Sequence, residues 1–274
     1  MSRNKDRINS NIPPQAMPEM VQQMTETVNP FNFIVPTEVV DLPSKGKYYP
    51  EGHPLKNVDS IEIKHMTAKE EDILTSQSLI KKGLAITKLL QSVMVDKSIR
   101  VNDLLIGDKN ALLVASRVHG YGSDYSVNLT CPKCFSRFDT VIDLSDLGEK
   151  ELTFPEDVSI TESGTFETVL PKSGFKVEFR LLTSADEMKL SKEADTGSTG
   201  LLKLIIVSIN DQTDRFFIER ALMALPIKDS SLLKKAYASV MPDIDMSCDV
   251  ECENCLEESK MEVPLTAEFF WPDL

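Results

Sequence analysis

Cysteine is the residue type whose spacing in this sequence points most directly to chemistry. Five cysteines are present, and four of them form two Cys-x-x-Cys pairs, Cys131/Cys134 and Cys252/Cys255. Two residues between ligands allow both sulfurs to reach one tetrahedral ion at about 2.3 Å. One pair is weak evidence, but two pairs supply four thiolates, the full ligand set of a closed structural zinc site. We therefore predict one structural Zn²⁺ bound by these four residues.

A dithiol redox motif is the alternative that has the same spacing as Cys131-Pro-Lys-Cys134. In such motifs a helix begins at the first cysteine and lowers the pKa of its thiol. Here Phe138-Asp-Thr-Val-Ile-Asp-Leu144 alternates with period two, which is typical of a strand. The pattern favours zinc over redox chemistry, and ordinary free cysteines remain the simplest alternative.

The fifth cysteine, Cys248, leaves the ligand set open at one point. It lies four residues before Cys252, so three thiols compete for two positions in this part of the chain. Because Cys252 and Cys255 repeat the spacing of the first pair, we predict that Cys248 is the spare thiol. A set that contains Cys248 and Cys252 remains open.

The segments around the cysteines indicate how they are positioned. Strand-like residues, Ser126–Thr130 and Phe138–Leu144, flank the first pair, and the extended stretch Lys260-Met-Glu-Val-Pro264 follows the second. A cysteine pair on a tight turn between strands is the knuckle of a zinc ribbon. The inner ligands are 252 − 134 = 118 positions apart, so one ion would join two distant parts of the chain.

The second half of the sequence resembles the first. Leu170-Pro-Lys-Ser-Gly174 is similar to Leu42-Pro-Ser-Lys-Gly46. Asp108 precedes Cys131 by 131 − 108 = 23 positions, and Asp229 precedes Cys252 by 252 − 229 = 23. Such self-similarity indicates repeated structural units. The predicted fold is α+β, with two similar strand–helices–strand units that arose by internal duplication and are joined by a zinc-ribbon-like four-cysteine site.

Helices are expected between the strands of each unit. Thr67-Ala-Lys-Glu70 and Ser184-Ala-Asp-Glu187, which follows Thr183, have the pattern of capping boxes at helix starts. Apolar periodicity predicts the remaining helices. They cover about 84–95, 108–118, 201–209, 215–224 and 230–241.

These patterns predict that the chain is divided into three segments. Residues 1–38 are polar and rich in Asn, Gln and Pro, so they should form a mobile arm that buries little apolar surface. Residues 39–150 form the first unit with the first cysteine knuckle. Residues 151–274 form the second unit with the second knuckle and a C-terminal tail.

The charge of the chain argues against several functions. Its net charge is −13 and its pI is about 4.8, so the phosphate backbone of a nucleic acid should repel it. No apolar run approaches the roughly 20 residues that span a bilayer, and the N-terminal residues lack the apolar core of a secretory signal. We expect an intracellular protein without direct nucleic-acid or membrane contacts.

Known catalytic patterns are absent from the sequence. There is no phosphate-binding Gly-x-x-x-x-Gly-Lys loop, no His-Glu-x-x-His and no Gly-x-Ser-x-Gly. The three histidines, His53, His65 and His119, are scattered, and no acid/base pair stands out. We therefore expect a protein that binds other proteins rather than an enzyme.

Two stretches near the ends of the chain carry a resemblance to a known family. Val39-Val-Asp-Leu-Pro-Ser-Lys-Gly-Lys-Tyr-Tyr49, with Ile61-Glu-Ile63 and Met66-Thr-Ala-Lys-Glu-Glu71 after it, resembles the opening of the T4-like phage baseplate hub family. Ala267-Glu-Phe-Phe-Trp-Pro272 is similar to the family's C-terminus.

This resemblance implies a protein of a contractile-tailed bacteriophage that acts in baseplate hub assembly or structure in the host cytoplasm. It could stay in the virion tail or act only as an assembly factor. It implies no catalytic residues, and the zinc prediction is independent of it. A zinc-ribbon accessory protein of transcription or replication is the alternative class, and a dithiol oxidoreductase is a third.

Aromatic side chains are the candidate contacts for hub partners. Large, rigid rings carry much of the binding energy at interfaces. The two stretches of the resemblance, together with the N-terminal arm, are the segments expected to dock. Their rings belong to Tyr48, Tyr49, Phe269, Phe270 and Trp271. The alternative is that they pack into the protein's own core.

The charge generates a first testable prediction. Double-stranded DNA should bind this chain no better than it binds an acidic control protein of similar net charge, measured by fluorescence anisotropy at about 150 mM salt. Salt-sensitive binding at micromolar concentration would contradict this and would favour the transcription or replication class.

Overall fold

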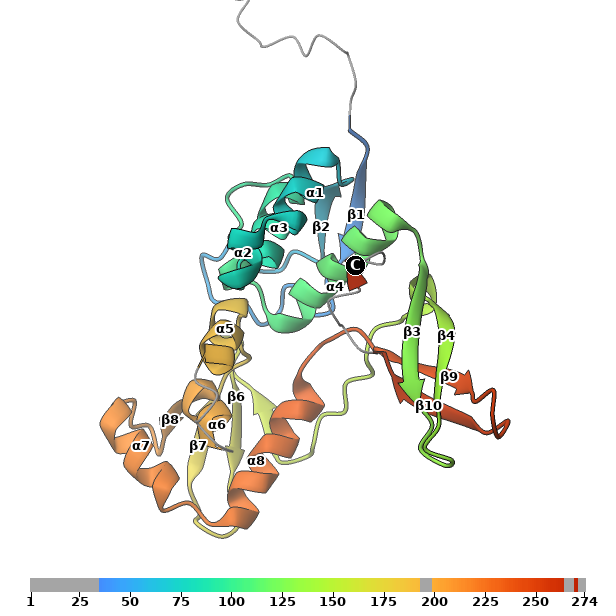
Figure 1. Cartoon of the computed structure of the whole chain (residues 1–274). Helices are drawn as coiled ribbons and strands as arrows, with labels where there is room; N and C mark the ends of the chain where they lie inside the picture. The colour runs from blue at the N-terminus through green and yellow to red at the C-terminus, as the bar shows by residue number, and fades with distance from the viewer. Residues whose placement is uncertain (1–34, 193–198, 264–268, 271–274) are drawn as a thin grey trace, which may run out of the picture. The chain divides into compact units, whose positions relative to one another are not determined.

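Short antiparallel sheets and helices alternate along the chain in the computed structural model (Figure 1). The structure describes residues 35–192, 199–263 and 269–270. The chain from Pro36 to Leu274 forms one compact unit. That unit contains both predicted halves, and their boundary at residues 150/151 stays a prediction. The predicted N-terminal arm lies, up to residue 34, outside the described residues.

Every strand pairing in the named sheets of the described chain is antiparallel. There are three two-stranded sheets, β1–β2, β3–β4 and β9–β10, and one sheet in the order β5–β6–β7–β8. The strands are β1 (Thr37–Asp41), β2 (Ser60–Lys64), β3 (Asp124–Thr130), β4 (Arg137–Asp143), β5 (Val158–Ile160), β6 (Phe166–Val169), β7 (Lys176–Phe179), β8 (Ile206–Ile209), β9 (Ser247–Glu251) and β10 (Glu258–Glu262).

Helices occupy the stretches between these sheets. They are α1 (Ala68–Thr75), α2 (Gln77–Lys81), α3 (Ala85–Val93), α4 (Ile106–Tyr121), α5 (Ser184–Lys192), α6 (Gly200–Ile205), α7 (Arg215–Met223) and α8 (Ile227–Val240). Short 3₁₀ turns, η2 (Val101–Asp103) and η3 (Leu144–Asp146), complete the described elements. The predicted α+β class is confirmed.

One predicted helix is wrong over its second half. Residues 201–209 were expected to form one helix, but α6 ends at Ile205 and Ile206–Ile209 form strand β8. β8 pairs with β7, where Val177 lies opposite Ile209. The β-branched residues of β8 suit a pleated surface, and pairing with a neighbouring strand outweighs their helical spacing.

The second capping box is shifted by one residue from its predicted position. Thr183, rather than Ser184, lies at the start of α5. Its N–H and hydroxyl donate to the Asp186 carboxylate at 3.2 and 2.9 Å. The motif therefore matches Thr67-x-x-Glu70 of the first half, where the Thr67 N–H and hydroxyl donate to Glu70 at 3.0 and 2.6 Å.

Two buried aspartates tie the similar turns to similar helices. Asp108, in the first turn of α4, accepts from the N–H and hydroxyl of Ser44 at 3.0 and 2.6 Å. Asp229, in the first turn of α8, accepts from the N–H groups of Lys172 and Ser173 at 3.0 and 2.7 Å. Both aspartates are fully buried. The two halves thus share a local construction, while their origin by duplication stays a prediction.

A single hydrophobic cluster includes residues from β1 to Phe270 and so draws on both halves. The start of α4 lies very close to the chain that follows α8: a Cβ added at Gly107 would lie 1.9 Å from the carbonyl oxygen of Pro242. Only glycine fits there, so this position fixes the distance between α4 and the segment that leads into β9.

Glu70 provides a test of how the first half is held together. Its side chain is fully buried. Burial alone would raise its pKa, but hydrogen bonds from Lys64, Ser92 and Thr67 outweigh burial and lower the pKa to about 2. A carboxylate with a lowered folded-state pKa contributes stability above its unfolded pKa, and the contribution is lost as pH falls toward the folded value.

We expect Glu70→Gln to lower the free energy of unfolding by roughly 2–3 kcal/mol at pH 7, in line with the pKa shift. The difference from the wild type should shrink between about pH 4.5 and pH 2. Urea unfolding at several pH values measures this. Glu71→Gln, on the exposed side of the same helix, is the control. An equal loss in both variants would contradict the role of the buried network.

Candidate metal centre

Two β-hairpins present the four paired cysteines. The first pair lies at the turn of β3–β4, and the second pair lies at the turn of β9–β10. The N–H of Cys131 donates to the Ser136 carbonyl at 3.0 Å, and the N–H of Cys252 donates to that of Glu257 at 3.0 Å. The two turns therefore have the same hydrogen bonding, as expected of zinc-ribbon knuckles.

The turns also share a strained backbone position. Phe135 and Leu256 directly follow the second cysteine of each turn and have φ values of 59° and 54°. Residues other than glycine rarely adopt this left-handed conformation. The N–H of each residue donates to the carbonyl of the first cysteine, at 3.0 and 2.8 Å. The strained residue thus closes each turn, and both cysteines of a pair lie on the closed loop.

The hairpins lie side by side (Figure 1). Their four sulfur atoms meet at the two turns. All four Sγ atoms lie within 4.8 Å of one another. The Sγ atoms of Cys131 and Cys255 are 3.7 Å apart, as are those of Cys134 and Cys252. A tetrahedral ion with metal–sulfur bonds of about 2.3 Å requires sulfur pairs about 3.8 Å apart. The thiols therefore have the spacing of a metal site rather than of disulfides, which require about 2.05 Å.

The charge of four thiolates at this distance suits a divalent cation. Hydrogen bonds with Ser136 lower the pKa of Cys134 to about 6. The backbone of Glu257 acts to lower the pKa of Cys255, but burial and the neighbouring thiols outweigh it and raise this pKa to about 12. Four adjacent thiolates repel one another, and a divalent cation removes that penalty by binding all four.

The fifth thiol lies outside the cluster. Cys248 is on β9, and its Sγ faces the carbonyl of Met261 at 3.8 Å. Because Cys248 is held within the paired part of the hairpin, it cannot join the turn without breaking the pairing of β9 with β10. The four-cysteine cluster of the structure therefore does not contain Cys248, the thiol that was predicted to be spare. Four cysteine ligands suit Zn²⁺. An ion pair between Lys133 and Glu257 also links the two turns.

The predicted partner-binding aromatics lie mostly inside the protein, so the structure favours the core alternative for them. Tyr49 is 1% exposed, and its hydroxyl donates to Asp108 at 2.7 Å. Phe269 and Phe270 are 2% and 3% exposed, and Phe269 packs edge-on against Tyr125. These rings lie in the core, where packing against apolar side chains removes their surface from water.

The remaining two predicted aromatics are Tyr48 and Trp271. Tyr48 is half-buried and its ring lies 5.3 Å from that of Phe166. Trp271 lies outside the described residues. Tyr48 is thus the one described member of the predicted set that is partly exposed.

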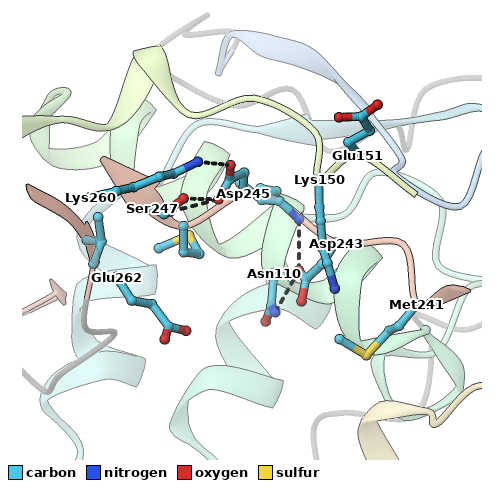
Figure 2. Close-up of a pocket in the computed structure, with 12 residues that line it drawn as sticks. Asn110, Lys150, Glu151, Met241, Asp243, Asp245, Ser247, Lys260 and Glu262 are labelled. Carbon is cyan, nitrogen blue, oxygen red and sulfur yellow. Dashed lines mark hydrogen bonds and ion pairs between the residues drawn. The ribbon is translucent and has the colours of Figure 1, made fainter. Parts of the chain in front are cut away.

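A cleft of about 810 Å³ lies at the base of the second hairpin (Figure 2). Charged and polar side chains line it, and several of them bind each other. Asn110 donates to Asp243 at 3.0 Å, and Lys260 pairs with Asp245 at 3.2 Å. Burial raises the pKa of Asp243 although Asn110 donates to it. The first contact connects α4 to the segment entering β9, and the second connects that segment to β10, so both help to position the second cysteine turn.

Comparison with known proteins places the chain in a family. A family model described as "T4 bacteriophage base plate protein" matches residues 34–271. The chain belongs to this family. No match was found among curated proteins or among solved structures.

The family match covers both cysteine pairs, so the four-cysteine cluster lies within the matched part of this baseplate protein. It also extends the resemblance seen at the two ends of the sequence to the whole described fold. Among the described residues, no helix is both long enough and apolar enough to cross a lipid bilayer.

The metal centre generates a third prediction. Freshly purified protein should contain about one zinc per chain by plasma mass spectrometry, because four thiolates form a closed site. Cys255→Ser should lose the metal and unfold at a clearly lower temperature. Cys248→Ser is the matched control and should keep both metal and stability.

A purified chain without metal would contradict this centre. Loss of metal in Cys248→Ser with retention in Cys255→Ser would instead assign the site to the alternative thiol set.

Proposed function

We propose that this baseplate protein acts in the assembly or structure of the baseplate hub of a contractile-tailed phage, as a non-catalytic, zinc-stabilised binding protein. The observation that carries the proposal is the meeting of two cysteine turns, 118 positions apart, inside a chain that matches the family over residues 34–271. A centre that joins distant segments serves to hold a shape, and a fixed shape is what an assembly component presents to its neighbours.

The chemistry of the centre supports a structural role for zinc. A closed site of four cysteines leaves no position for a substrate, whereas catalytic zinc keeps one open. Cys131 and Cys252, the first cysteines of the two pairs, are buried at 0% and 1% exposure, so attack by either of them on a substrate disulfide is hindered. The dithiol oxidoreductase alternative therefore has little support from the geometry.

An exposed apolar face on α7 is the surface that best suits a protein partner. Phe216 and Met223, two helical turns apart, are 69% and 71% exposed. Ile227, at the start of α8, is 86% exposed. Exposed apolar residues that gather on one face mark interaction sites. Arg220 lies over the Phe216 ring at 5.8 Å, so the face combines a cation with aromatic surface, as interface cores do.

The proposed partners are other baseplate hub proteins of the same phage, met in the host cytoplasm during assembly. Retention in the virion tail then requires that the complex with these partners is stable. In this proposal one face of α7 packs against the core and the opposite face contacts the partner. Ile218 and Leu222 pack into the core, while Phe216 and Met223 are exposed for contact with a partner.

Co-expression with the phage's own baseplate proteins tests the proposal. The tagged chain should capture a hub component identified by mass spectrometry. Phe216→Ser/Met223→Ser should reduce capture about tenfold or more, because interface anchors of this size each contribute about 1 kcal/mol or more. Phe154→Ser, which removes a ring that is 42% exposed elsewhere, is the control.

Each outcome has a distinct meaning. Equal capture by the double variant removes the α7 face from the proposal. Absence of every hub component from the wild-type complex overturns the hub role, whatever the metal content.

A further inference from the structure

Three potential metal ligands meet at a second place in the fold. Glu38 lies on β1, His65 directly follows β2, and His119 lies in the last turn of α4. One ligand atom of each lies within 4.8 Å of those of the other two. No local pattern in the sequence points to this cluster, because the two histidines are 54 positions apart (119 − 65) and match no metal-binding motif.

Backbone contacts hold the three residues in place. The N–H of His65 donates to the Pro36 carbonyl at 2.9 Å, which extends the pairing of β1 with β2. Glu38 lies opposite Ile63 in that pairing. The imidazole rings of His65 and His119 stack with centroids 5.0 Å apart. The ligands therefore project from a paired hairpin and a helix, which position side chains better than loops do.

One atom in the cluster lacks a partner. Nε2 of His65 is buried, and among the described residues it has no hydrogen-bond partner. It lies 3.6 Å from Oε1 of Glu38, which is an ion-pair distance when His65 is protonated but is beyond a normal hydrogen bond. A buried polar atom without a partner is unfavourable and calls for an unseen ligand or ion. Two ligands on one tetrahedral ion at about 2.1 Å lie about 3.4 Å apart, close to the separation found here.

We propose that Glu38, His65 and His119 form a second metal site, which takes a divalent transition-metal ion such as Zn²⁺. Imidazole and carboxylate ligands suit such ions. Three protein ligands leave at least one coordination position for water, unlike the closed four-cysteine centre. The glutamate side chain is 48% exposed and that of His65 is 29% exposed, so the ion exchanges with solvent. An ion bound there connects the start of β1 to the end of α4.

Titration of the zinc-containing full chain with ZnCl₂ by calorimetry tests the proposal. We expect one further ion per chain, with weaker binding than at the four-cysteine centre. His65→Gln and His119→Gln should each weaken this second binding at least about tenfold, as loss of a metal's supporting groups does. Glu62→Gln, an exposed neighbour on β2, and His53→Gln, remote from the cluster, should leave it unchanged.

A second measurement does not depend on variants. In NMR spectra of the wild-type protein, added Zn²⁺ should shift the imidazole signals of His65 and His119 and leave those of His53 in place. The proposal is overturned if the wild type binds no second ion, or if the second ion persists in both histidine variants. It is also overturned if all three imidazoles respond alike. None of these outcomes bears on the hub role, which rests on partner capture.

Discussion

The convergence of four thiols is the constraint on which the rest of the fold depends. Bringing two cysteine turns together closes a loop of more than a hundred residues, which costs about 4–5 kcal/mol of chain entropy. A zinc site of this kind supplies about 10–16 kcal/mol in isolated fingers. That range is comparable with the stability of a whole domain, about 5–15 kcal/mol. The hairpins β3–β4 and β9–β10 are short two-stranded ribbons of a kind that is marginally stable alone, so an ion bound between them would stabilise both.

Buried carboxylates organise the starts of the helices. Asp108 and Asp229 each receive hydrogen bonds from a preceding turn, and Glu70 and Asp186 each receive them from a threonine at a helix start. A buried carboxylate is tolerated only when donors surround it. These contacts therefore specify where each helix begins relative to its turn, and through α4 and α8 they set the position of the hairpins that follow.

The cysteine cluster and the buried carboxylates both lie within the part of the chain that matches the baseplate family. In this baseplate protein the buried carboxylates stabilise the interior, while α7 leaves Phe216 and Met223 exposed. The aromatics near the two ends of the family match, Tyr49, Phe269 and Phe270, instead complete the core.

The sequence by itself determined the features that depend on neighbours along the chain. The cysteine spacing, the Thr67 capping box and the alternation in β3 and β4 are local signals, and each predicted its element. Only the tertiary structure determined the features that depend on contacts between residues far apart in the sequence. Residues 206–209 form a strand because β7 lies beside them. Tyr49 is buried, and Asp108 on a distant helix accepts from its hydroxyl. Likewise, His65 and His119 meet only because α4 packs beside the β1–β2 hairpin, a distance that no local pattern encodes.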